Sequence, residues 1–303
     1  MQAPVPRVRR SGGMLVTIDR FILVFVAGVL FAHRLNAGSL EEPSLLELAA
    51  IIGKDDRITI RQKANNDPQE VARLMRDYPT RQFHCGGFVS TANVVYGNDV
   101  ILLPAHALDD ENCELLGAAR DGSCHLTDHD GSTYAIDVKS VISGVELYKA
   151  ANKECRFVER PDDPAMDAAD WAVVRLTEPL KGVRPYDLRA LPLSDEGMAL
   201  TLVASRAANL PASPDEMNFQ ACRWMSTKIV GGSIQFFKTN CDGGRGMSGG
   251  ALVNDNRQIV GIHIRSVPTD GRPYDVFMNY GTVTPVTDEV IRAARKVAGL
   301  SQD

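Results

Sequence analysis

Short apolar runs separated by turn residues dominate the chain. Residues 134–142 alternate between apolar and polar side chains, which is typical of a strand with one buried face. Further short runs, bounded by Gly, Pro, Asn and Asp, cover residues 199–204, 233–238, 251–254 and 258–264. Many short strands with turn signals between them predict a barrel or a sandwich.

The same pattern predicts one clear helix, at the C-terminal end of the chain. Thr287 can cap its N-terminus, and Gly299 follows its last turn. Acidic residues occupy the first turn and basic residues the last, as the helix dipole favours. One face of this helix is apolar and carries Val290, Ala294, Val297 and Ala298.

The N-terminal segment has the pattern of an export signal. Several arginines precede an apolar run over residues 21–32, which suits a signal-peptide core and is short for a membrane span. We expect residues 1–37 to be a signal peptide, with an uncleaved anchor as the alternative. The short acidic segment over residues 38–50 is expected to be a propeptide or linker, and residues 51–303 are expected to form the folded domain.

The composition is that of an ordinary globular protein. The 303 residues allow one large or two small domains, and apolar residues make up 44% of them. A net charge of −5 argues against a nucleic-acid partner. Six cysteines fit an exported protein with up to three disulfides, so we expect a secreted or periplasmic location.

A glycine-rich stretch with a single serine, residues 241–253, runs into an apolar strand. Its five glycines let the backbone adopt positive φ and expose its amides. Gly246 and Ser248 are spaced so that both amides could face one oxyanion, as acyl transfer requires. The alternative is a glycine-rich hairpin without chemistry.

A serine nucleophile needs a base and a group that orients the base. His106 ends an apolar run, and Asp170 stands at the start of another. Either residue alone could be structural, and Asp167 competes for the acidic role. We prefer Asp170 because it directly abuts the apolar run. A lipase or esterase of the α/β-hydrolase fold is disfavoured, since its acid and histidine follow the serine and only His263 does so here.

Four motifs in this order resemble the trypsin-like (chymotrypsin-fold) serine proteases. Residues 83–90 resemble the family's early strand. Leu-Pro-Ala-His at 103–106 stands where the family has Thr-Ala-Ala-His. Asp-Trp-Ala-Val at 170–173 stands where it has Asp-Ile-Ala-Leu. Gly-Met-Ser-Gly-Gly-Ala-Leu at 246–252 stands where it has Gly-Asp-Ser-Gly-Gly-Pro-Leu. The resemblance covers the chain from about residue 51 to its C-terminus.

The resemblance implies an all-β fold. We expect two packed six-stranded antiparallel β-barrels, a C-terminal helix, and an active site in the cleft between the barrels. It also implies a monomeric serine endopeptidase that acts on proteins or peptides, away from any membrane once its signal is cleaved. His106, Asp170 and Ser248 would form the catalytic triad, with the amides of Gly246 and Ser248 as the oxyanion hole.

Pro104, directly before the histidine, departs from the family's motif and could shift the strand. The alternative function is therefore a catalytically inactive protease-like domain that binds peptides or partner proteins. No metal or organic cofactor is predicted. Histidines and aspartates do crowd residues 125–130, but the turn residues around them predict a solvated loop.

Two features bear on substrate preference and point in opposite directions. Asp242 lies six residues before Ser248, where trypsins carry the aspartate that recognises Lys or Arg. Gly-Ile-His at 261–263 resembles the glutamyl endopeptidases, whose pocket histidine contacts an acidic side chain. We expect His263 to line the pocket, and the sequence alone assigns no cleavage preference.

Further comparison with the family concerns the cysteines and the start of the domain. The family's partner for Cys85 would follow the histidine, where Ala107 stands, so Cys85 must pair elsewhere or stay free. Cys222 and Cys241 are the best single pair, because they would flank a hairpin that leads into the glycine-rich stretch with Ser248, called the serine loop below.

Residues 51–58 resemble the mature start of glutamyl-endopeptidase-like proteins. Met247 cannot form the salt bridge to a new N-terminal amine that activates animal trypsins.

Overall fold

The computed structural model describes residues 51–300, except for 111, 153–163, 192–196, 206–216, 231–232, 245, 267–271 and 276–279. The predicted signal peptide and propeptide, residues 1–50, lie outside the described residues. No helix within the described ranges is long and apolar enough to cross a membrane.

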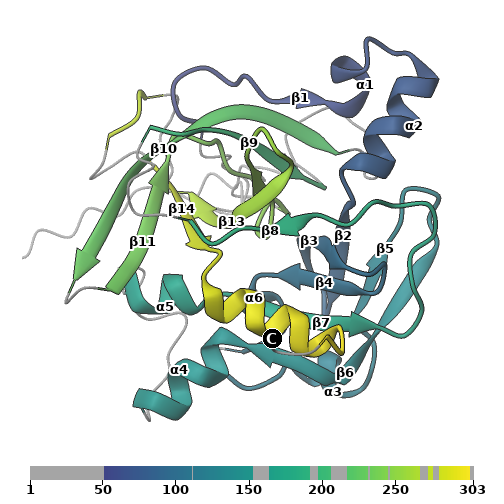
Figure 1. Ribbon diagram of the computed structural model, residues 1–303, viewed down its shortest axis with the longest axis vertical. Coiled ribbons are helices and arrows are strands. Elements are labelled where there is room, and N and C mark those ends of the chain that lie inside the picture. Colours follow the sequence, from purple (N-terminus) through teal and green to yellow (C-terminus); the bar gives the residue numbers. More distant parts are fainter. Residues whose placement is uncertain are drawn as a thin grey trace, which may run out of the picture. The chain divides into compact units, whose positions relative to one another are not determined.

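The first half of the domain is a closed antiparallel barrel (Figure 1). Around the barrel the strands follow the order β2-β3-β4-β7-β6-β5. Their bounds are β2 (Thr80–Cys85), β3 (Phe88–Tyr96), β4 (Val100–Leu103), β5 (His125–Thr127), β6 (Thr133–Ser143) and β7 (Ala172–Leu176). The alternating run predicted as a half-buried strand is β6.

The second half closes in the same way, since β9 pairs with both β10 and β12. Its ring order is β9-β10-β11-β14-β13-β12, and all of these pairs are antiparallel. The strands are β9 (Ala199–Ala204), β10 (Asn218–Val230), β11 (Ser233–Thr239), β12 (Ala251–Val253), β13 (Gln258–Ser266) and β14 (Gly281–Pro285). Two short strands lie outside the ring, β1 (Ile58–Thr59) on β10 and β8 (Asp187–Leu188) on β13. The predicted pair of six-stranded barrels is confirmed.

Strand β4 shows why its sequence is an uninterrupted apolar run. All four of its residues are buried, because both of its faces meet hydrophobic surface. Ile101 and Leu103 belong to the core of the first barrel. Val100 and Leu102 join a second cluster that contains the apolar face of helix α6 (Asp288–Val297), which lies against β4 and β7 (Figure 1). A helix seals this side of the sheet.

The C-terminal helix has the predicted cap, since the Thr287 side chain accepts a hydrogen bond from the amide of Val290. The expectation of only one clear helix was wrong. Helix α2 (Pro68–Asp77) is just as long, starts at Asp67 as N-cap and has Pro68 in its first turn. Its core-facing side is narrow, because only Leu74 is fully buried, and apolar periodicity therefore did not reveal it. The shorter helices are α1 (Ile60–Lys63), α3 (Gly117–Arg120), α4 (Gly144–Asn152) and α5 (Pro164–Ala169).

Disulfides tie loops to the barrels. Cys222 and Cys241 are bonded as predicted, which joins β10 to the segment that leads to Ser248. Cys85 pairs with Cys124, at the end of β2 and just before β5. Cys113 is disulfide-bonded as well, and the described part of the chain contains no free cysteine.

Candidate active site

His106 and Asp170 are brought together by the pairing of β4 with β7, which sets Leu103 opposite Ala172. One carboxylate oxygen of Asp170 lies 2.7 Å from Nδ1 of the His106 ring. The other accepts the backbone N–H of the same histidine at 3.0 Å. Asp170 is buried, and it therefore fixes both the position and the orientation of the imidazole.

Pro104 is compatible with this arrangement. It has φ −72° and ψ 142°, and it directly precedes a short 3-10 turn that holds His106, residues Ala105–Ala107. Its extended backbone lets the chain leave β4 and enter that turn.

The charge of Asp170 sets the proton affinity of the imidazole. Burial disfavours the charged ring, but the Asp170 charge and its hydrogen bond outweigh this effect, so the pKa of His106 is raised above its ordinary value. About a third of the side chain (34%) stays exposed. The histidine can thus act as a general base that keeps its proton to a higher pH than an ordinary histidine does.

Asp167, the competing acid, points to other partners. Its carboxylate forms an ion pair with Arg265 at 2.7 Å, and its carbonyl accepts the hydroxyl proton of Thr284. It lies within α5, whereas Asp170 follows the end of that helix. Because the helix has ended before Asp170, the two carboxylates do not share a helix face, and each reaches a different partner.

The serine loop is held by polar groups of β3, from the other barrel. The backbone N–H of Thr91 donates to the carbonyl of Ser248 at 2.7 Å, and its hydroxyl donates to the carbonyl of Gly246 at 2.8 Å. The side-chain amide of Asn93 donates to the carbonyl of Gly249 at 2.7 Å. Because β3 belongs to the barrel that carries His106, these bonds set the serine relative to the histidine.

Ser248 itself donates its hydroxyl proton to the carbonyl of Ile264 at 2.9 Å. A hydroxyl has one proton, so it must rotate before it can donate to the histidine. The hydrogen bond between a catalytic serine and its histidine is often poorly aligned until substrate is bound. Among the described residues, none accepts a hydrogen bond from the amides of Gly246 or Ser248. Both amides therefore have their donor capacity left for a ligand.

Asp242 is a fully buried residue (0% exposed) at the start of the same segment. One of its carboxylate oxygens accepts the backbone N–H of Ile52 at 2.7 Å, and its own N–H donates to Gln220. Burial raises the pKa of Asp242 to about 6. Its other carboxylate oxygen, Oδ2, has no hydrogen-bond partner among the described residues.

His263 is also buried, and its Nε2 lies 3.0 Å from the hydroxyl of Ser266. Burial lowers the pKa of His263 to about 4, so the ring is neutral at physiological pH. Gly243 packs against this pair, since a Cβ there would come within 2.1 Å of the Ser266 hydroxyl. The two predicted pocket residues therefore both neighbour Gly243, Asp242 along the chain and His263 in space.

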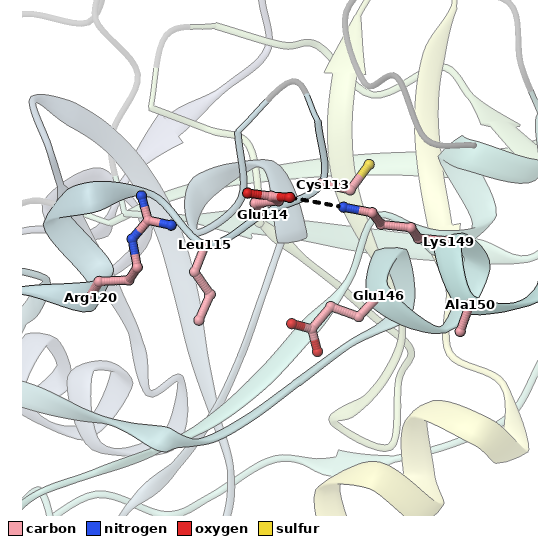
Figure 2. Close-up of a pocket in the computed structure, with 7 residues that line it drawn as sticks. All are labelled: Cys113, Glu114, Leu115, Arg120, Glu146, Lys149 and Ala150. Atoms are coloured by element: carbon pink, nitrogen blue, oxygen red, sulfur yellow. Dashed lines mark hydrogen bonds and ion pairs between the residues drawn. The ribbon is translucent and has the colours of Figure 1, made fainter. Parts of the chain in front are cut away.

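A separate pocket of about 500 Å³ lies beside α4 and contains none of these residues (Figure 2). Four charged side chains line it, Glu114, Arg120, Glu146 and Lys149, and Lys149 pairs with Glu114 at 3.4 Å. The ion pair partly neutralises the charge of the pocket. The pocket plays no part in the chemistry described below.

Comparison with known proteins agrees with the two-barrel fold. The sequence matches the trypsin-like peptidase domain family over residues 87–262. A Glu endopeptidase solved in complex with MPD is similar at a TM-score of 0.57 and 12% identity, over 82% of this chain and 99% of that one. A thermostable serine protease, AL20, from an extremophilic microorganism gives a TM-score of 0.51 and 14% identity, over 76% and 100%. No match to a curated protein was found.

Sequence reasoning missed the groups that hold the loop. Thr91 and Asn93 are both completely buried, two positions apart on one face of β3. Polar residues at this spacing within an apolar strand are the available signal, because a buried polar group must find a partner. The sequence does not reveal which partner that is.

Replacing Gly249 with alanine should disrupt the serine loop. Gly249 has φ +91°, and a Cβ there would lie 1.9 Å from the carbonyl oxygen of Thr91. The backbone conformation costs an alanine ~1–2 kcal/mol, and the overlap should add about 1–3 kcal/mol. Gly131→Ala is the matched control, with φ +84° and nothing within 4 Å. Urea unfolding of both variants would check the difference, and equal losses would contradict it.

Proposed function

The chain belongs to the trypsin-like peptidase family, and we propose that it is a serine endopeptidase working through an acyl-enzyme. The observation that carries this proposal is the pairing of Asp170 with His106, in which one buried carboxylate binds both the ring Nδ1 and the backbone amide. That arrangement leaves Nε2 as the basic nitrogen, which is the tautomer that general-base catalysis requires.

In the proposed mechanism the Ser248 hydroxyl turns from the Ile264 carbonyl towards Nε2 of His106 and attacks the peptide carbonyl. His106 takes the serine proton and passes it to the leaving amine. Asp170 stabilises the imidazolium that forms between these steps. The amides of Gly246 and Ser248 donate to the oxyanion of the tetrahedral intermediate. Water then hydrolyses the acyl-enzyme with His106 again acting as base.

We further propose that the described domain is the mature part of an exported protein. The disulfides fit an extracellular or periplasmic protein. Residues 1–37 would act as the signal peptide and residues 38–50 as a short propeptide. The enzyme would work as a monomer on protein or peptide substrates, without a cofactor.

For specificity, the contacts favour His263 over Asp242 as the group that selects the substrate. One oxygen of the fully buried Asp242 already accepts the Ile52 amide, and the nearby charge of Arg57 already acts on this carboxylate, whose Oδ2 alone lacks a partner among the described residues. His263 and Ser266 offer neutral hydrogen-bonding groups, with Nδ1 of His263 lacking a partner among the described residues. We therefore propose a preference for cleavage after acidic residues.

Ser248→Ala should abolish proteolysis without unfolding the domain. Loss of the nucleophile typically lowers kcat by ~10⁴-fold or more. The measurement is turnover of casein, with circular dichroism as the check on folding. Labelling of the wild type by a fluorophosphonate, located at Ser248 by mass spectrometry, separates this enzyme from an inactive peptide-binding relative. A wild-type protein that neither labels nor cleaves would contradict the proposal.

Activity should rise with pH as His106 loses its proton, because only the neutral ring can accept the proton of Ser248. The kcat/KM profile of the wild type should have its midpoint above the ordinary histidine value of about 6.5, since Asp170 raises the pKa of His106. Asp170→Asn removes that charge, so the midpoint should move down while kcat falls about 10⁴-fold.

The matched control for the pH experiment is Asp167→Asn, which alters the acid that pairs with Arg265. It should keep most of the activity and nearly the wild-type midpoint. If Asp167→Asn were the inactive variant and Asp170→Asn the active one, the roles assigned to the two aspartates would be wrong.

Digestion of a mixed peptide library should show more cleavage after Glu and Asp than after Lys and Arg. Asp242→Asn should leave that preference unchanged, because one Asp242 oxygen is held by the Ile52 amide and the charge of Arg57 already acts on the carboxylate. Cleavage after Lys or Arg that disappears in Asp242→Asn would instead make Asp242 the selecting group.

A further inference from the structure

The segment from Ile52 to Arg57 packs against the serine loop, and both of its end residues contact it. Its first amide, that of Ile52, binds the carboxylate of Asp242, as described above. The Asp56 carboxylate accepts a hydrogen bond from the side chain of Gln220 at 2.6 Å. The segment then continues into β1, which pairs with β10. The start of the domain is therefore part of the support for residues 242–248.

Arg57 is the charged group in this segment that reaches the serine loop. Its side chain is only 1% exposed. The Asp55 carboxylate receives two charge-assisted hydrogen bonds from it, Nε at 2.9 Å and Nη2 at 2.8 Å. The pairing with Arg57 lowers the pKa of Asp55, although burial acts in the opposite direction. The fork of Arg57 is thus locked in one orientation.

The remaining nitrogen of Arg57, Nη1, faces the turn just before the serine. It lies 3.5 Å from the carbonyl oxygen of Gly243 and 3.6 Å from Sδ of Met247. A Cβ on Gly244 would come within 3.2 Å of the same nitrogen. One buried cation therefore contacts the turn at its beginning and at its end, and it leaves little room for a side chain at Gly244.

This turn needs support from outside itself. A glycine has no side chain to restrict its backbone, so it loses more conformational freedom on ordering than other residues do. The amide of Gly246, one of the two proposed oxyanion donors, belongs to this turn, and Met247 is buried beside Arg57. Donors must already be aimed at the developing charge to be effective.

We infer that Arg57, locked by Asp55, is a positioning residue that holds the turn before Ser248 so that the Gly246 amide points into the oxyanion hole. This role rests on the proposed function, and it assigns a catalytic consequence to the first residues of the domain. Arg57 touches neither substrate nor reacting atoms and acts only through the turn.

The test compares Arg57→Met, Arg57→Lys and Asp55→Asn with the wild type in two reactions. Phosphonylation of Ser248 by a fluorophosphonate reports the oxyanion hole without a peptide, and peptide hydrolysis gives kcat and KM separately. Losing one oxyanion donor typically costs ~10²–10³-fold. We expect Arg57→Met to slow both phosphonylation and kcat by about that factor with little change in KM.

Arg57→Lys should fall between Arg57→Met and the wild type, since a lysine keeps the charge but cannot bind Asp55 through two nitrogens. Asp55→Asn should slow phosphonylation by a smaller factor. Arg73→Met is the matched control. Arg73 pairs with Glu70 and Asp77 on the surface of α2, and its loss should change neither reaction.

Failure of this inference and failure of the proposed function give different results. A wild-type protein that does not react at Ser248 refutes the proposed function. If the wild type reacts and Arg57→Met reacts equally fast, the inference about Arg57 is wrong. Should Arg57→Met fail to fold, Arg57→Lys and Asp55→Asn decide, because wild-type phosphonylation rates in both folded variants would overturn the inference.

Discussion

The candidate site depends on hydrogen bonds that cross from one barrel to the other. His106 and Asp170 belong to the first barrel, whereas Ser248 belongs to the loop that enters β12 of the second. Thr91 and Asn93 on β3 bind three carbonyl groups of that loop. Each acceptor is a main-chain oxygen, so the fit depends on backbone shape and not on particular loop side chains. These hydrogen bonds therefore fix the position of Ser248 relative to His106 and Asp170.

The same contacts explain the glycine at position 249, directly after the serine. At Gly249 the carbonyl of Thr91 approaches so closely that no side chain fits, and the chain passes through with positive φ. Burying Thr91 and Asn93 would be costly without partners, and the loop carbonyls supply them. The loop carbonyls thus satisfy the buried donors of the strand, and the same hydrogen bonds hold the loop in place.

Much of the fold and part of the site could be predicted from local pattern. Strand runs and the capped terminal helix follow from signals a few residues long, and the Cys222–Cys241 pair follows from the hairpin that the two cysteines are expected to flank. The Cys85–Cys124 pair could not be predicted, because it depends on the register that sets β2 against β5. Nor could the position of Arg57 under the serine loop, because the contacting residues are separated by 186 or more positions. Contacts of that kind are set by tertiary packing, which no single stretch of sequence encodes.

The Cys222–Cys241 bond has a practical consequence for the folding of this protein. It anchors the segment that leads to the nucleophile covalently to β10, and that anchor exists only after both thiols have been oxidised. A chain produced in a reducing cytosol would hold its reactive loop by noncovalent contacts alone. Oxidative refolding, or synthesis in an oxidising compartment, is accordingly the route to a preparation in which every molecule carries the same loop.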